Sequence, residues 1–119
     1  MNWKQFKKEL LREHKNLCFI DRIKTNRGSN EVRILRFFFC GEFEPFVNFY
    51  NAIGFYVIIE KSYFRKEYEV GIEFIEKDTQ KGMGYLNRYT FDKAEYCYNE
   101  AKNKIREIMQ LKCVIREGG

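Results

Sequence analysis

The sequence predicts an α+β fold: a single antiparallel sheet of about five strands with a long C-terminal helix packed on one face, plus an N-terminal helix and a short middle helix. Aromatic residues, which favour strands, make up 18% of the chain. Several segments alternate apolar and polar residues, as half-buried strands do, and the last third has helical periodicity. The 119 residues contain one proline and no low-complexity linker, which predicts a single domain spanning residues 1–119.

Residues 2–14 are expected to form the N-terminal helix. Asn2 is a suitable N-cap, and Trp3, Phe6 and Leu10 recur at helical spacing. His14, the one histidine of the chain, falls on the same face at the last turn. A cation is favoured near a helix C-terminus, which is a structural reason for His14, and Glu13 beside it is expected to point elsewhere.

Residues 17–25 and 31–40 are expected to form a β-hairpin around the turn "NRGSN", residues 26–30. Alternation in the second strand assigns its residues to two faces. One face holds Val32, Ile34, Arg36, Phe38 and Cys40, and the other holds Arg33, Leu35, Phe37 and Phe39. Neither face is cleanly polar, which suggests a strand that is covered on both sides at its end.

The segment "GEFEPFVNFYNAIG", residues 41–54, predicts the short middle helix. Pro45 suits the first helical position, and Gly54 is placed to terminate the helix. The helical spacing is carried by Phe46, Phe49, Tyr50 and Ile53. A loop anchored by buried phenylalanines would have a similar pattern, and this alternative stays open.

Residues 55–62 and 67–76 are expected to form a second hairpin around "YFRK", followed by a fifth strand at residues 84–90. The strand at 67–76 has the clearest alternation in the chain. Its apolar face holds Tyr68, Val70, Ile72 and Phe74, and its acidic face holds Glu67, Glu69, Gly71 and Glu73.

The long helix is expected over about residues 91–112. Its apolar face comprises Ala94, Cys97, Tyr98, Ala101, Ile105 and Ile108. Asp92 as N-cap with Glu95 would complete a capping box, Thr90 being the competing cap, and Phe91 would contact Tyr96 as a hydrophobic staple. The triplet Tyr96–Cys97–Tyr98 is therefore interpreted as parts of two helix faces and not as a nucleophilic site.

The residue types needed for common chemistry are missing, so the sequence predicts a protein that is not an enzyme and has no catalytic residues, cofactor or metal. The chain has one histidine, and its cysteines, Cys18, Cys40, Cys97 and Cys113, lack the spacing of a zinc site. "KGMGY" is not a phosphate-binding loop, because it precedes a strand. The N-terminus has no apolar central region and no apolar run approaches membrane-spanning length, which favours a cytoplasmic location.

The C-terminal half, with "YTFDKAEYCYNEAKNKIREIM" after an aromatic-rich hairpin, resembles many small phage and prophage proteins of unassigned function. The resemblance covers roughly residues 55–112 and matches no catalytic motif. It implies an origin in a mobile element and a function by binding, either to nucleic acid or to a host protein.

Charge is unevenly distributed along the chain, and this carries the first functional hypothesis. Residues 1–40 hold ten Lys/Arg and four Asp/Glu, whereas residues 41–80 hold four and eight. Such a basic start is typical of a polyanion-binding face, although it is equally typical of solvated surfaces that attract each other. We expect nucleic acid, DNA or RNA, to contact a basic hairpin and helix comprising Arg22, Lys24, Arg27, Arg33, Arg36, Lys4 and Lys8. Phe37 and Phe39 would offer stacking surfaces if exposed.

The alternative hypothesis is a protein–protein interaction module or inhibitor that binds a host protein. Its surface would comprise Glu67, Glu69 and Glu73 with Tyr63 and Phe64 at the hairpin tip. Exposed strand edges pair readily, so a homodimer through the sheet edge is a further form of this hypothesis.

Overall fold

The computed structural model describes residues 2–40 and 52–118, which form two helices and five strands. In chain order these are α1 (Trp3–Glu13), β1 (Leu17–Arg27), β2 (Asn30–Phe39), β3 (Ala52–Ser62), β4 (Glu67–Glu76), β5 (Gly82–Phe91) and α2 (Ala94–Gly118). The predicted α+β class, with an N-terminal helix, one antiparallel sheet and a long C-terminal helix, is confirmed.

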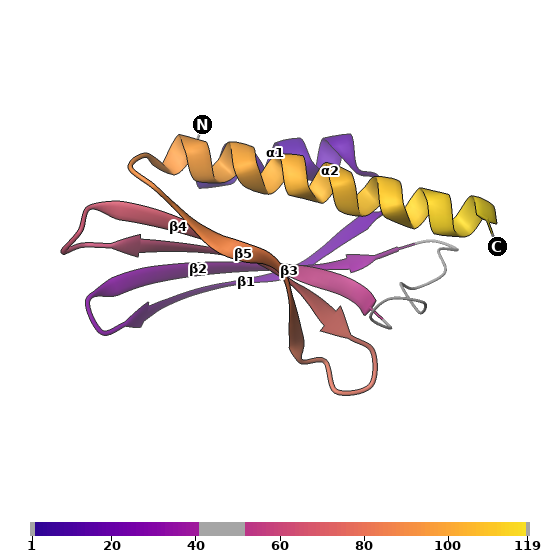
Figure 1. Ribbon diagram of the computed structural model, residues 1–119, viewed down its shortest axis with the longest axis horizontal. Helices are drawn as coiled ribbons and strands as arrows, with labels where there is room; N and C mark the ends of the chain where they lie inside the picture. The colour runs from indigo at the N-terminus through magenta and orange to yellow at the C-terminus, as the bar shows by residue number, and fades with distance from the viewer. Residues whose placement is uncertain (1, 41–51, 119) are drawn as a thin grey trace.

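The five strands form one antiparallel sheet in the order β1-β2-β3-β4-β5, so each strand lies beside the one that precedes it in the chain. Figure 1 shows that the sheet is strongly twisted. The pairing has register shifts in β1 between Phe19 and Asp21 and in β3 between Ala52 and Gly54. The pairing of β4 with β5 shifts twice between Val70 and Glu73. β1 and β5 are the edge strands.

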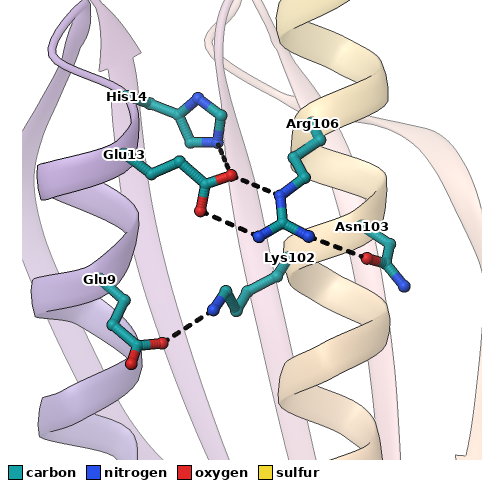
Figure 2. Close-up of polar contacts among 6 residues, drawn as sticks. All are labelled: Glu9, Glu13, His14, Lys102, Asn103 and Arg106. Carbon is teal, nitrogen blue, oxygen red and sulfur yellow. Dashed lines mark hydrogen bonds and ion pairs between the residues drawn. The ribbon is translucent and has the colours of Figure 1, made fainter.

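Both helices lie side by side on one face of the sheet and run in the same direction (Figure 1). Two ion pairs, one turn apart, join them: Lys102 Nζ donates to Glu9 at 2.8 Å, and the Arg106 guanidinium contacts both oxygens of Glu13. Figure 2 shows these contacts, together with the hydrogen bond from Arg106 to Asn103. The parallel arrangement brings the first turns of α1 and α2 to the same end of the molecule.

The core lies between the sheet and the two helices. α1 contributes Trp3, Phe6 and Leu10, which follow the predicted stripe. α2 contributes Cys97, Tyr98, Ala101, Ile105, Ile108 and Met109, and the strands contribute alternating residues such as Leu35, Phe37, Phe55, Val57, Ile72 and Phe74. The rings of Phe6 and Tyr98 are 5.0 Å apart, so aromatic contact joins the two helices as well.

The predicted middle helix at 41–54 is not seen. Residues 41–51 lie outside the described residues, and residues 52–54 belong to β3. Gly54, which was expected to end a helix, pairs with Phe38 inside the sheet. A Cβ at this position would stand 2.0 Å from the carbonyl oxygen of Phe37, so the close approach of two strands explains this glycine.

The other element boundaries are close to those expected. The strand at 67–76 is confirmed residue for residue, whereas the first hairpin turn is tighter than predicted, with Arg27 paired with Asn30 and Gly28 in the left-handed conformation at φ 61°. α2 begins at Ala94, later than the predicted start at residue 91, and the Lys93 carbonyl accepts from the Tyr96 amide. The predicted contact between Phe91 and Tyr96 is present, with ring centres 6.4 Å apart.

α2 has 25 residues and is therefore about 37 Å long. Its described part is amphipathic, with Tyr96 exposed opposite the buried face. None of the helices in residues 2–40 and 52–118 combines the length and apolar character needed to cross a bilayer.

His14 is the C-cap of α1, and its role differs from the one expected. Its Nε2 atom is 3.9 Å from a carboxylate oxygen of Glu13, which therefore points toward the ring (Figure 2). The side chain is 10% exposed, and this burial lowers the pKa of His14. The neutral ring is thus favoured, and attraction of a cation to the helix dipole does not account for the residue.

Candidate nucleic-acid interface

The helix-covered side of the β1–β2 hairpin carries Arg22, Lys24 and Arg33. Arg22 pairs with Leu35, which belongs to the core beneath the helices, and Lys24 pairs with Arg33. Cross-strand partners share a face of an antiparallel sheet, so these three cations face the side on which α1 lies. We call these three residues, with Lys4 and Lys7 of α1, the basic face.

Lys7 shows how closely the cations of α1 approach those of β1. Its Nζ atom lies 5.3 Å from the centre of the Phe19 ring on β1. The pKa of Lys7 is lowered, first by burial and then by the positive charges of Arg22 and Lys4. The fold therefore holds like charges near one another on two different elements.

Glu31 fixes two members of the basic face. Arg33 Nε donates to Glu31 Oε1 at 2.9 Å, and Lys24 Nζ lies 3.7 Å from Glu31 Oε2. The Tyr63 hydroxyl of the neighbouring hairpin donates to Oε2 at 3.0 Å. The pKa of Glu31 is lowered, chiefly by the hydrogen bond from Arg33, so the carboxylate stays ionised and orients both cations.

The surface is hollowed on both sides of Trp3. One hollow of about 300 Å³ lies among Trp3, Arg22, Ile23, Lys24 and Arg33. A second, of about 330 Å³, is also lined by Trp3 and Arg33 and continues toward β3, β4 and the start of α2. The Arg33 guanidinium carbon is 5.8 Å from the centre of the Trp3 ring, so the basic face has an aromatic residue at its middle.

The structure brings together four of the predicted site residues, Lys4, Arg22, Lys24 and Arg33, in the basic face. Lys8 is exposed on α1, with no described contact to the hairpin, and two further residues lie elsewhere. Arg27 is exposed at the end of β1, away from α1. Arg36 pairs with Tyr56 on the opposite face of the sheet, with its guanidinium 5.6 Å from the centre of the Phe38 ring.

Phe37 and Phe39 do not provide the stacking surfaces considered from the sequence. Phe37 is fully buried against Phe19 and Phe55, and Phe39 is half-buried and packs on Phe55. The alternation in the sequence correctly placed both phenylalanines on the same face of β2 as Arg33. At their end of the strand, however, this face packs into the core. Their rings are part of the packing that supports the cations.

Sequence reasoning missed Trp3, Glu31 and Lys61 as parts of this region. Trp3 has the spacing of a core residue, and Lys61 stands in a different hairpin from the other cations. The register of β2 on β3 pairs Glu31 with Lys61. These residues could have been found only by predicting the register in which β2 pairs with β3. The sequence contains no direct indication of that register.

A different part of the surface carries the acidic residues of the alternative hypothesis. Of those residues, Glu67, Glu69 and Phe64 line a hollow of about 360 Å³, to which Glu60 and Arg65 also contribute. Asn30 donates to Glu60 at 3.1 Å. Glu73 lies further along β4, and Phe64 is 84% exposed at the hairpin tip. No cluster of three metal-ligating side chains occurs among the residues that the structure describes.

The Tyr96–Cys97–Tyr98 triplet is divided between the surface and the core, as the helical periodicity indicated. Tyr96 is 46% exposed, whereas Cys97 is fully buried. Burial raises the pKa of the Cys97 thiol to about 12. At neutral pH this thiol is protonated, which is the inert form.

Comparison with protein-family models, curated proteins and solved structures finds no match to this chain.

Proposed function

We propose that the basic face binds the phosphate backbone of nucleic acid. The observation that supports this most directly is geometric: Arg22, Lys24 and Arg33 share the side of the β1–β2 hairpin on which α1 lies, and Lys7 of α1 reaches the Phe19 ring of β1 at 5.3 Å. The fold holds these cations near one another, so they repel. A polyanion that binds among them relieves this repulsion, because each cation then has a negatively charged phosphate as its nearest charged neighbour. The expected ligand is DNA or RNA recognised without regard to sequence.

The ion pairs of the two helices strengthen this interpretation. Glu9 and Glu13 are on α1 as well, yet they point toward α2 and neutralise Lys102 and Arg106 (Figure 2). The carboxylates of α1 are therefore directed toward α2, and Lys7 of α1 lies near the positive charges of Arg22 and Lys4.

A pair of charge reversals tests the proposal. We expect fluorescence anisotropy to show binding of labelled DNA or RNA at about 50 mM salt, with log Kd rising against log salt with a slope of several units. Lys4→Glu with Arg22→Glu should weaken binding at least tenfold and reduce that slope by about 2, because each lost phosphate contact contributes about 0.9. The matched control, Lys77→Glu with Lys81→Glu, makes the same change of charge at exposed positions around the β4–β5 turn.

Equal loss of affinity in both double variants would show that net charge and not the basic face governs binding. Absence of binding to all four polymers, single- and double-stranded DNA and RNA, at low salt would refute the proposal. Circular dichroism of each variant shows whether the charge reversals leave the fold intact.

The exposed tip of the β3–β4 hairpin favours a second candidate, recognition of a host protein. Phe64 is 84% exposed and lines the acidic hollow, whereas Tyr63, 51% exposed at the same tip, donates to Glu31 on the basic face. Aromatic residues are common at the centres of protein interfaces. The partner should remain bound in about 300 mM salt, where screening weakens purely electrostatic contacts. Phe64→Ala should release it, whereas Lys4→Glu with Arg22→Glu should not.

A further inference from the structure

The second hollow beside Trp3 differs from the rest of the basic face, because aromatic side chains line much of it. It lies where the first turns of α1 and α2 meet the sheet. Its principal lining residues are Trp3, Arg33, Lys61, Tyr68, Ala94 and Tyr98. We call it the helix-end pocket, and its volume of about 330 Å³ lies within the range of small-ligand sites.

The walls of the helix-end pocket are rigid and largely preformed. Trp3 and Tyr98 are each 7% exposed, and their ring centres are 6.1 Å apart. Both side chains are packed into the core, so they keep their positions whether or not a ligand is present. Tyr68, on β4, forms part of the facing wall.

Two cations border the pocket and lie against aromatic rings. Arg33 is 5.8 Å from the Trp3 ring centre, and Lys61 Nζ is 5.7 Å from that of Tyr68. Arg33 is also paired with Glu31, whereas the ring contact of Lys61 holds its ammonium group at the pocket without supplying an opposite charge. A ligand with a flat unsaturated ring and a nearby phosphate would match both features.

Glu31 also lines the pocket and distinguishes between ligands. It accepts from Arg33 and Tyr63 and pairs with Lys24, and a carboxylate offers about four acceptor positions. A free inorganic anion would be repelled by this carboxylate, whereas the exocyclic amine of a base can donate to it. The lining therefore favours a base attached to a phosphate over a phosphate alone.

We propose that the helix-end pocket binds one unstacked base of a single-stranded nucleic acid. The pocket shares Trp3 and Arg33 with the neighbouring hollow that contains Arg22 and Lys24. A strand whose phosphates follow Arg22 and Lys24 can thus place a base beside Trp3. A duplex keeps its bases stacked and paired, so it can use the phosphate contacts but not the pocket.

This inference rests on the proposed function, and Trp3 makes the two separable. It is the sole tryptophan of the chain, so its fluorescence reports on the pocket directly. We expect a single-stranded oligonucleotide of about 12 nucleotides to change Trp3 emission and to bind about tenfold more tightly than the duplex of the same sequence. AMP and UMP at high concentration should produce the same spectral change, and inorganic phosphate should not.

Ala94→Leu tests the pocket by filling it. Ala94 lies at the first position of α2, where leucine is a good helix former. This variant should lose the preference for single strands and the Trp3 response while keeping the duplex affinity. Asn99→Leu, which adds the same side chain at an exposed position of α2, is the matched control and should behave as the unmodified protein.

The results distinguish failure of the pocket proposal alone from failure of both proposals. Equal binding of single strand and duplex with unchanged Trp3 emission would overturn the pocket proposal and leave the basic face in place. A Trp3 response to inorganic phosphate equal to that to AMP would overturn it too. Absence of binding to either polymer would overturn both proposals. The titrations of the unmodified protein decide the matter even if Ala94→Leu fails to fold.

Discussion

At Gly54, the close approach of a neighbouring strand determines which residue type the position can hold. Its position after an aromatic segment suggested the end of a helix. In the sheet it faces Phe38, and a Cβ would also stand 2.8 Å from the Phe38 Cα atom. Backbone atoms of a central strand cannot move aside as a flexible side chain can, so any larger residue strains the β2–β3 pairing.

Gly54→Ala should therefore destabilise the protein by about 2 kcal/mol or more. Gly84→Ala is the matched control, because a Cβ there meets no atom within 4 Å, and its effect should stay within about 0.5 kcal/mol. Urea denaturation of both variants measures the difference. Similar midpoints for the two would contradict the close approach of β2 and β3 at Gly54.

At the scale of elements, apolar packing and ion pairs contribute differently to the docking of α1 on α2: the first to its stability, the second to its register. Phe6 is fully buried and contacts Tyr98, whereas Glu13 and Arg106 are 33% and 47% exposed. Water screens the exposed pair, so its net contribution is small even with two hydrogen bonds. The ion pairs favour one register of the helices, and the buried rings supply most of the stability.

Phe6→Ala should accordingly reduce the free energy of unfolding by about 3–5 kcal/mol. A double-mutant cycle of Glu13→Gln and Arg106→Gln should give a coupling energy of about 0.2–1 kcal/mol. Both are obtained from denaturant titrations at one pH and salt concentration. A coupling energy as large as the Phe6→Ala effect would show that the ion pair dominates helix docking.

Much of this arrangement of elements could be predicted from local patterns. The strand at 67–76 was predicted to its exact bounds because its alternation is uninterrupted, and the core face of α2 followed from its periodicity. Of the segment predicted as the middle helix, residues 41–51 lie outside the described residues, and only residues 52–54 are shown to belong to β3 instead. The pairing of Gly54 with Phe38 depends on a strand 16 residues earlier in the chain, which local periodicity does not reveal.

The candidate site was predictable in composition but not in geometry. Arg22, Lys24 and Arg33 follow from the hairpin, and Arg33 was already assigned to the face opposite Arg36. The proximity of Lys7 to Arg22 depends on the direction in which α1 crosses β1, and that direction is set by the burial of Trp3, Phe6 and Leu10. The helix-end pocket is lined by residues of α1, β2, β3, β4 and α2, so no local sequence pattern predicts it.

On the scale of the whole molecule, several titratable groups make stability depend on pH. Burial lowers the pKa of His14 from its ordinary 6.5. Hydrogen bonds from Lys102, Arg106 and Arg33 lower those of Glu9, Glu13 and Glu31 from 4.5. For every one of these groups the unfolded chain binds the proton more readily, so stability rises with pH in its titration range.

Stability should therefore be lost in two stages as pH falls. The first begins below about 6.5, as His14 becomes protonated in the unfolded chain, and the second begins below about 4.5, as the carboxyl groups do. His14→Gln should remove the first stage and leave the second. Urea midpoints between pH 7.5 and 3.5 measure both, and a constant midpoint from 7.5 to 5 in the unmodified protein would contradict the burial of His14.

The strand order has a consequence for the growing chain. Every strand pairs with its predecessor, so hairpins can form one after another during synthesis, and such local topology favours rapid folding. α2 is made after all five strands, yet it supplies Ala101, Ile105 and Ile108 to the core and the partners of Glu9 and Glu13. Until α2 leaves the ribosome, the apolar face of a nearly complete sheet is shielded by α1 alone among the described helices. Nascent chains halted before residue 94 should accordingly bind chaperones that recognise exposed apolar surface, and release from them should coincide with the emergence of α2.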